Sequence, residues 1–157
     1  MKRWALLSLA LAACSPPDAP ESNGVAAENA AEPAPPAAPP PEMGAIGMAD
    51  IEAELAPGSG CSLVYDGKDL LVAVDGDAIA KPNGTTLHFD FDGDFEGDLE
   101  ALFAGGAFTA QGITITVAPA ETEGQQIEEL NVKPATATVE RADGGRVRFE
   151  AEWQCGS

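Results

Sequence analysis

The fold is decided by the stretch ATATVERADGGRVRFEAEWQC, residues 135–155. Apolar side chains occupy alternate positions on both sides of Asp143-Gly144-Gly145, which is the pattern of half-buried β-strands. The apolar set is Ala137, Val139, Val147, Phe149, Ala151, Trp153 and Cys155. Pairing odd with odd residues requires an odd-numbered loop, most simply three residues with a glycine bulge. The stretch therefore predicts an antiparallel hairpin, with Glu140 opposite Arg146 on the outer surface.

Similar alternation recurs upstream of this hairpin. Strands are predicted around Cys61–Tyr65, Leu70–Val74, Thr85–Asp92 and Ile113–Val117, with turns at Asp66-Gly67 and Asn83-Gly84. Apolar spacing predicts helical turns at 48–55 and 99–103, whereas 121–131 is ambiguous. We therefore expect a mainly β fold, a small antiparallel sandwich or barrel of about six to seven strands with one or two short helical turns.

The amino terminus has the composition of a secretory signal. Lys2 and Arg3 precede the apolar run Trp4–Ala12, which is too short to span a membrane. Leu11-Ala12-Ala13-Cys14 resembles the lipobox of bacterial lipoproteins. The resemblance implies cleavage before a lipidated Cys14, a lipid-anchored protein of the cell envelope that faces the periplasm, and, from Ser15, the outer membrane rather than the inner one. The alternative is an ordinary secretory signal with a chance cysteine.

A linker separates this signal from the folded domain. Residues 15–42 hold nine Pro, eight Ala and five acidic residues, and large apolar side chains are nearly absent from them. Such a composition cannot build a core and favours an extended polyproline II spacer. The predicted organisation is a lipoprotein signal peptide over 1–13, a lipidated cysteine and disordered acidic linker over 14–46, and a β-rich periplasmic domain over 47–157.

The other two cysteines are predicted to form a disulfide. Cys61 and Cys155 lie on the apolar parity of their strands, so both side chains should point inward and meet. An exported protein meets an oxidising compartment, where such a pair is stable. The alternatives are two inert buried thiols or one reactive thiol, which would need His88 as its base.

The charge balance limits the classes of partner. The chain has 26 acidic and 8 basic residues, a formal charge of −18, and loss of Lys2 and Arg3 with the signal peptide makes it −20. This balance excludes nucleic acid, whose binding depends on Lys and Arg, and favours a cationic protein or peptide. With one histidine and no motif for a phosphate loop, a serine nucleophile or a zinc site, the chain is not expected to be an enzyme.

The segment 90–100 is the one candidate metal site. Asp92, Asp94, Glu96, Asp98 and Glu100 fall at positions 1, 3, 5, 7 and 9 of a calcium loop, with Gly97 at position 6. Position 12, which needs a bidentate Glu, is Phe103, so any calcium binding would be weak. The alternative is a solvated acidic face, and no other cofactor is expected.

Two resemblances concern the plan of the chain. The lipobox, spacer and small disulfide-linked β-domain are similar to lipoprotein inhibitors of c-type lysozyme, although Ser59-Gly60 and Tyr65 match their Ser-Gly-x-x-Tyr loop with a different spacing. The ending from Ala135 to Cys155 resembles small proteobacterial envelope lipoproteins, which implies architecture and no activity. The expected function is non-enzymatic binding or scaffolding; the alternatives are weak calcium or small-ligand binding and lysozyme inhibition.

Overall fold

The computed structural model describes residues 39–93 and 99–156. The predicted signal peptide, Cys14 and the linker as far as residue 38 lie outside the described residues, as do Asp94, Glu96 and Asp98 of the candidate calcium loop. Within the described residues, neither helix has the length and apolar character that crossing a bilayer requires.

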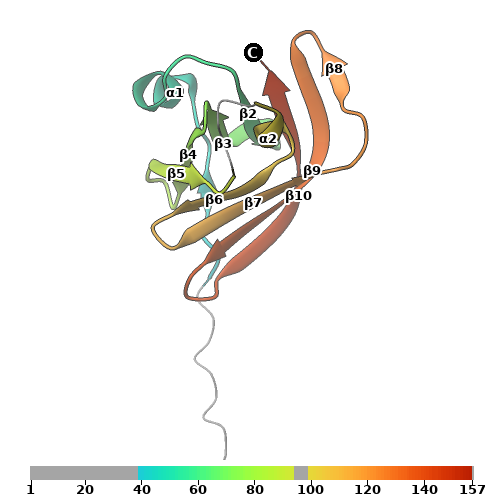
Figure 1. The fold of residues 1–157 in the computed structure, drawn as a ribbon. Helices are drawn as coiled ribbons and strands as arrows, with labels where there is room; N and C mark the ends of the chain where they lie inside the picture. The colour runs from blue at the N-terminus through green and yellow to red at the C-terminus, as the bar shows by residue number, and fades with distance from the viewer. Residues whose placement is uncertain (1–38, 94–98, 157) are drawn as a thin grey trace, which may run out of the picture. The chain divides into compact units, whose positions relative to one another are not determined.

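Twelve elements follow one another along the described chain (Figure 1). They are β1 (Met43–Gly44), α1 (Met48–Glu54), β2 (Gly60–Tyr65), β3 (Lys68–Val74), β4 (Asp77–Pro82), β5 (Leu87–Phe91), α2 (Leu99–Phe103), β6 (Gly106–Ala110), β7 (Ile113–Pro119), β8 (Gln125–Ile127), β9 (Leu130–Arg141) and β10 (Arg146–Gly156). The mainly β prediction is thereby confirmed, with two short helices.

Eight of the strands close into an antiparallel barrel. Their order is β4-β3-β2-β10-β9-β7-β6-β5, and β5 pairs again with β4. Of the two predicted architectures the chain therefore adopts the barrel, which leaves its eight strands without a free edge. Strand β1 pairs with the last two residues of β4, and β8 pairs with the first residues of β9.

The barrel has more strands than the sequence pattern predicted. Two barrel strands, β4 and β6, were not predicted. Outside the barrel, β1 was not predicted either, and β8 lies in the stretch 121–131 that the sequence left ambiguous. In β4 the consecutive residues Ala78, Ile79 and Ala80 are all buried, and three of the five residues of β6 are alanine or glycine, so hydropathy alternates weakly in both. The three residues of β8 are all exposed. Burial of small residues between neighbouring strands, rather than a local pattern, makes these segments part of the sheet.

Tight turns set the register of the hairpins. Asp66 and Gly67 have φ values of 51° and 69° between the paired residues Tyr65 and Lys68. A two-residue hairpin turn with both central residues in this region matches the twist of its strands, which is why Asp-Gly is favoured there. The turn predicted at Asp66-Gly67 is confirmed.

The C-terminal hairpin has the predicted register. Val147 pairs with Val139, and Arg146 with Glu140. The backbone N–H of Arg141 donates to the carbonyl of Gly145 at 2.8 Å, which leaves a loop of three residues. Gly144 in that loop has φ 96°, the conformation that glycine adopts most readily. The parity of the apolar residues was therefore sufficient to fix the pairing of the two longest strands.

Side chains fill the interior of the barrel. The largest fully buried ones include Trp153, Phe89, Phe108, Leu63 and Leu71. Alanines at positions 73, 78, 80, 135 and 137 are also buried, so small residues on some strands leave room for large ones on others. Helix α2 adds Leu102 to this core, and its carbonyl accepts the indole N–H of Trp153 at 3.0 Å.

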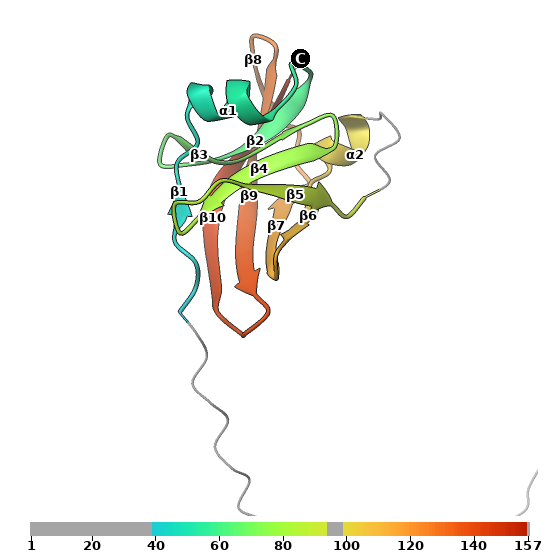
Figure 2. The same ribbon diagram turned by 90° about the vertical axis from the view of Figure 1, so that its left-hand side faces the viewer.

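Helix α1 covers part of the outer surface of the barrel, beside β3 and β4 (Figure 2). Ile46 and Leu55, which flank the helix, pack with Val72 of β3 and Ile79 of β4 in a second apolar cluster. These two strands are consequently buried on both faces, which explains their nearly continuous apolar sequence.

The folded part of the chain begins inside the segment 14–46 that was predicted as linker. Met43 and Gly44 pair with Pro82 and Lys81 of β4, and Ile46 is buried. A two-residue strand next to a proline-rich segment has no periodicity that sequence analysis would detect.

Cys61 and Cys155 are joined in a disulfide. They are directly opposite each other on β2 and β10, and both are buried. The bond thus connects the first and last strands of the barrel, which are 94 residues apart in sequence.

Candidate functional site

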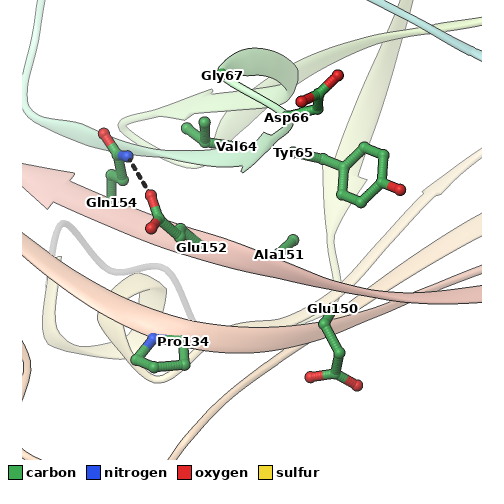
Figure 3. Close-up of a pocket in the computed structure, with 9 residues that line it drawn as sticks. All are labelled: Val64, Tyr65, Asp66, Gly67, Pro134, Glu150, Ala151, Glu152 and Gln154. Atoms are coloured by element: carbon green, nitrogen blue, oxygen red, sulfur yellow. Dashed lines mark hydrogen bonds between the residues drawn. The ribbon is translucent and has the colours of Figure 1, made fainter.

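A hollow of about 740 Å³ lies where β2 meets β10 (Figure 3). We call it the acidic groove. It is lined by Val64, Tyr65, Asp66, Gly67, Pro134, Glu150, Ala151, Glu152 and Gln154. Residues 150, 152 and 154 have the outward parity of β10, opposite to Trp153 and Cys155, so the groove is on the outer surface of the barrel. The charged residues of its lining are all acidic: Asp66, Glu150 and Glu152.

Neighbouring polar groups hold two of these carboxylates. The amide of Gln154 donates to Glu152 at 2.9 Å, and the hydroxyl of Thr136 on β9 donates to Glu150 at 3.2 Å. Asp66 is fixed differently, because it occupies the left-handed turn after β2. The carboxylates are thus placed on the rigid strand β10 and on a tight turn, and charge-assisted hydrogen bonds from a cationic side chain could reach them from solvent.

A second hollow, of about 340 Å³, adjoins the groove. We call it the apolar mouth. It is lined by Pro41, Met43, Tyr65, Asp66, Lys68, Leu70, Val147 and Phe149. Val147 and Phe149 have the inward parity of β10 but are only half-buried, because they lie at the end of the barrel away from Trp153 and α2. The charged residues here, Asp66 and Lys68, have opposite signs.

Tyr65 and Asp66 line both hollows. The Tyr65 ring meets Phe149 edge to face, with centroids 5.0 Å apart, while 47% of Tyr65 stays exposed. Tyr65 occupies the same alternate positions of β2 as Cys61 and Leu63, as the sequence indicated. It is exposed because it is the last residue of the strand, at the rim of the barrel, where no further layer covers it. A large exposed aromatic ring thus separates an acidic hollow from an apolar one.

His88 is held between two carboxylates. Its Nε2 lies 3.1 Å from Glu54 of α1 and its Nδ1 lies 3.1 Å from Asp77 of β4. The hydrogen bond with Glu54, followed by that with Asp77, raises the pKa of His88 above its ordinary value of 6.5. His88 therefore links helix α1 to the barrel, together with an ion pair of 2.7 Å between Lys81 and Asp50. That lysine and the backbone N–H of Gly47 lower the pKa of Asp50.

The candidate calcium residues are only partly described. Asp92 is exposed just after β5, and Glu100 is exposed at the start of α2. Over residues 39–93 and 99–156, the structure groups no three His, Cys, Asp or Glu side chains in a metal-binding arrangement. Calcium binding by the full segment 90–100 stays a prediction.

The residues that echo the lysozyme-inhibitor loop do not come together. Gly60 is the first residue of β2 and Tyr65 is the last, so Ser59-Gly60 and Tyr65 flank opposite ends of one strand. The acidic groove is not among the sites predicted from the sequence. The signal that points to it is the outward parity of Glu150 and Glu152, which becomes meaningful only when β2 is known to lie beside β10.

Comparisons with protein families, with curated proteins and with solved structures find no match to this chain.

Proposed function

We propose that the protein is a non-enzymatic lipoprotein of the cell envelope whose acidic β-barrel binds a cationic protein or peptide. The observation that carries the binding role is the lining of the acidic groove, whose charged members are Asp66, Glu150 and Glu152. The formal charge of −18 supports the same role, because it attracts cationic partners at long range and repels anionic ones.

The anchor is proposed from the lipobox Leu11-Ala12-Ala13-Cys14. Two acyl chains on Cys14 satisfy the condition for stable membrane attachment, since one chain alone gives only reversible binding. Ser15 favours the outer membrane, with the barrel facing the periplasm. Replacement of Cys14 by Ser should abolish incorporation of labelled palmitate, and a labelled variant would refute the anchor.

A non-catalytic role is supported by the state of the chain's single histidine. Both ring nitrogens of His88 are engaged by carboxylates, one on α1 and one on β4. A general base for a serine or cysteine nucleophile needs one ring nitrogen directed at that nucleophile. His88 instead has the contacts of a structural link between a helix and the barrel.

The binding role is tested by calorimetric titration of an oligolysine peptide into the purified protein. The informative variant is E150Q/E152Q, which keeps the size of both side chains and removes two charges from the groove. Its matched control is E128Q/E129Q, which removes two charges from the exposed turn between β8 and β9. We expect E150Q/E152Q to weaken binding roughly tenfold and the control to change it much less.

Equal losses in the two variants would show that only net charge matters and would reject the groove. Failure of oligolysine to bind the wild-type protein would reject the proposed function. A c-type lysozyme, as a basic protein, serves as a second titrant: binding with loss of its activity would identify the inhibitor role, and binding without that loss would leave the general one. Calcium, the other predicted ligand, is tested by the melting temperature in millimolar calcium, with D92N/D94N as the variant.

A further inference from the structure

We infer that the partner is amphipathic: it places a cationic side chain in the acidic groove and a neighbouring apolar side chain in the apolar mouth, across Tyr65. This inference rests on the proposed function and narrows it from any polycation to a cationic segment with an apolar anchor. A partner recognised by its charge alone would need only the acidic groove.

The two hollows form one continuous surface. Tyr65 and Asp66 belong to the lining of both, so a segment that crosses the Tyr65 ring passes from one to the other. The groove offers Glu150 and Glu152 on one side of the ring, and the mouth offers Val147 and Phe149 on the other. Val147 and Phe149 have the inward parity of β10, and Glu150 and Glu152 have the outward parity, so one strand supplies both the carboxylates and the apolar side chains.

The mouth has the properties of an anchor site. Its volume of about 340 Å³ is enough for one large apolar side chain. Phe149, Val147 and Met43 are half-buried and pack against the core, so an inserted side chain would extend an existing apolar cluster rather than form a new one. The opposite charges of Asp66 and Lys68 at the rim nearly cancel, so the mouth does not attract cations as the groove does.

Tyr65 suits the junction between the two sites. An exposed tyrosine ring provides apolar contact area at little cost in side-chain entropy, and its face attracts a lysine or arginine side chain. Tyrosine is also enriched among the residues that dominate protein interfaces. The edge-to-face contact with Phe149, at 5.0 Å, holds the ring in place before a partner arrives.

The test compares two peptides of equal length and charge, one alternating Lys and Leu and the other alternating Lys and Ser. Binding of each is measured with the wild-type protein and with Tyr65→Ala, E150Q/E152Q and Met48→Ala. Met48 is the matched control, because it is 69% exposed on α1 and lines neither hollow. Circular dichroism of each variant verifies that the barrel is intact.

We expect the Lys/Leu peptide to bind roughly tenfold more tightly than the Lys/Ser peptide. Tyr65→Ala should remove most of that difference, E150Q/E152Q should weaken both peptides, and Met48→Ala should change neither. Equal affinities for the two peptides in the wild-type protein would overturn the inference and leave the proposed function standing. An equal loss in Met48→Ala and Tyr65→Ala would overturn it as well. If neither peptide binds, the proposed function fails together with the inference.

Discussion

At the scale of single residues, Trp153 connects the barrel core to helix α2, because its side chain is large and apolar but carries one N–H donor. Trp153 is 1% exposed, fills the centre of the core, and donates its indole N–H to Leu102 of α2. A buried carbonyl of a helix end needs a donor, because leaving it unpaired costs free energy. The backbone N–H of Gly105 donates to this carbonyl at 3.0 Å, and the indole adds a second donor that ties a short helix, which would be unstable in isolation, to the barrel core.

Replacement of Trp153 by Phe tests this contact. The variant keeps an aromatic core but removes one of the two donors to the Leu102 carbonyl, which still accepts from the backbone N–H of Gly105. We therefore expect the free energy of unfolding to fall by about 0.5–1.5 kcal/mol, the net contribution of one hydrogen bond. Urea denaturation measures the change. Tyr65→Phe is the control, because it removes a polar group from an exposed ring and should alter stability little. Equal stability of Trp153→Phe and the wild-type protein would show that the bond contributes nothing.

At the scale of elements, helix α1 is attached to the barrel by apolar contacts below and by charged groups at its two ends. Asp50 near its start pairs with Lys81 of β4, and Glu54 at its end pairs with His88 of β5. Both ion pairs lie at the surface, so each contributes modestly. Their pH dependence differs, because the pKa of His88 is raised above its ordinary value of 6.5, whereas the pKa of Asp50 is lowered below its ordinary value of 3.8.

The stability of the chain should therefore depend on pH through His88. Its pKa is raised in the folded state by Glu54 and Asp77, so folding favours the protonated ring. This contribution is complete below the unfolded pKa of about 6.5 and is lost as the pH rises through the higher folded value. Denaturation between about pH 6 and about pH 8 should show a decline that His88→Gln reduces. An identical decline in that variant would exclude His88 as its source.

Sequence patterns predicted the strands in which apolar and polar residues alternate over many positions. They missed the short strands that form only because neighbouring strands pair with them. The hairpin 135–155 was predicted with its register because apolar residues mark one face of each strand. In contrast, β6 has one fully buried large residue, Phe108, and β8 has none, so no local signal distinguishes them from loops. The acidic groove belongs to the second kind, because residues 64–66 and 150–154 line one hollow only through the pairing of β2 with β10.

At the scale of the whole molecule, the disulfide joins the first and last strands of the barrel across 94 residues. In the chain-entropy model, a link over a loop of this length stabilises the folded state by about 4–5 kcal/mol, because it restricts the unfolded chain. Both cysteines are buried between paired strands, so the bond should resist reduction while the barrel is folded.

We expect the double variant Cys61→Ala/Cys155→Ala to keep the barrel and to lose about 4–5 kcal/mol of unfolding free energy. Denaturant titration with and without reductant measures this loss. Reductant should lower the stability of the wild-type protein and leave the double variant unchanged. Wild-type stability that does not respond to reductant in denaturant would contradict a stabilising bond.

The proposed binding site lies on the surface of the molecule, because side chains fill the interior of the barrel and the charged residues face solvent. The most direct measurement is a map of backbone amide chemical shifts in the isotope-labelled protein as the Lys/Leu peptide is added. We expect the largest changes at 64–68 and 147–154, the segments that form the acidic groove and the apolar mouth. Changes confined to 88–92, or to the turn between β8 and β9, would contradict the groove as the binding surface.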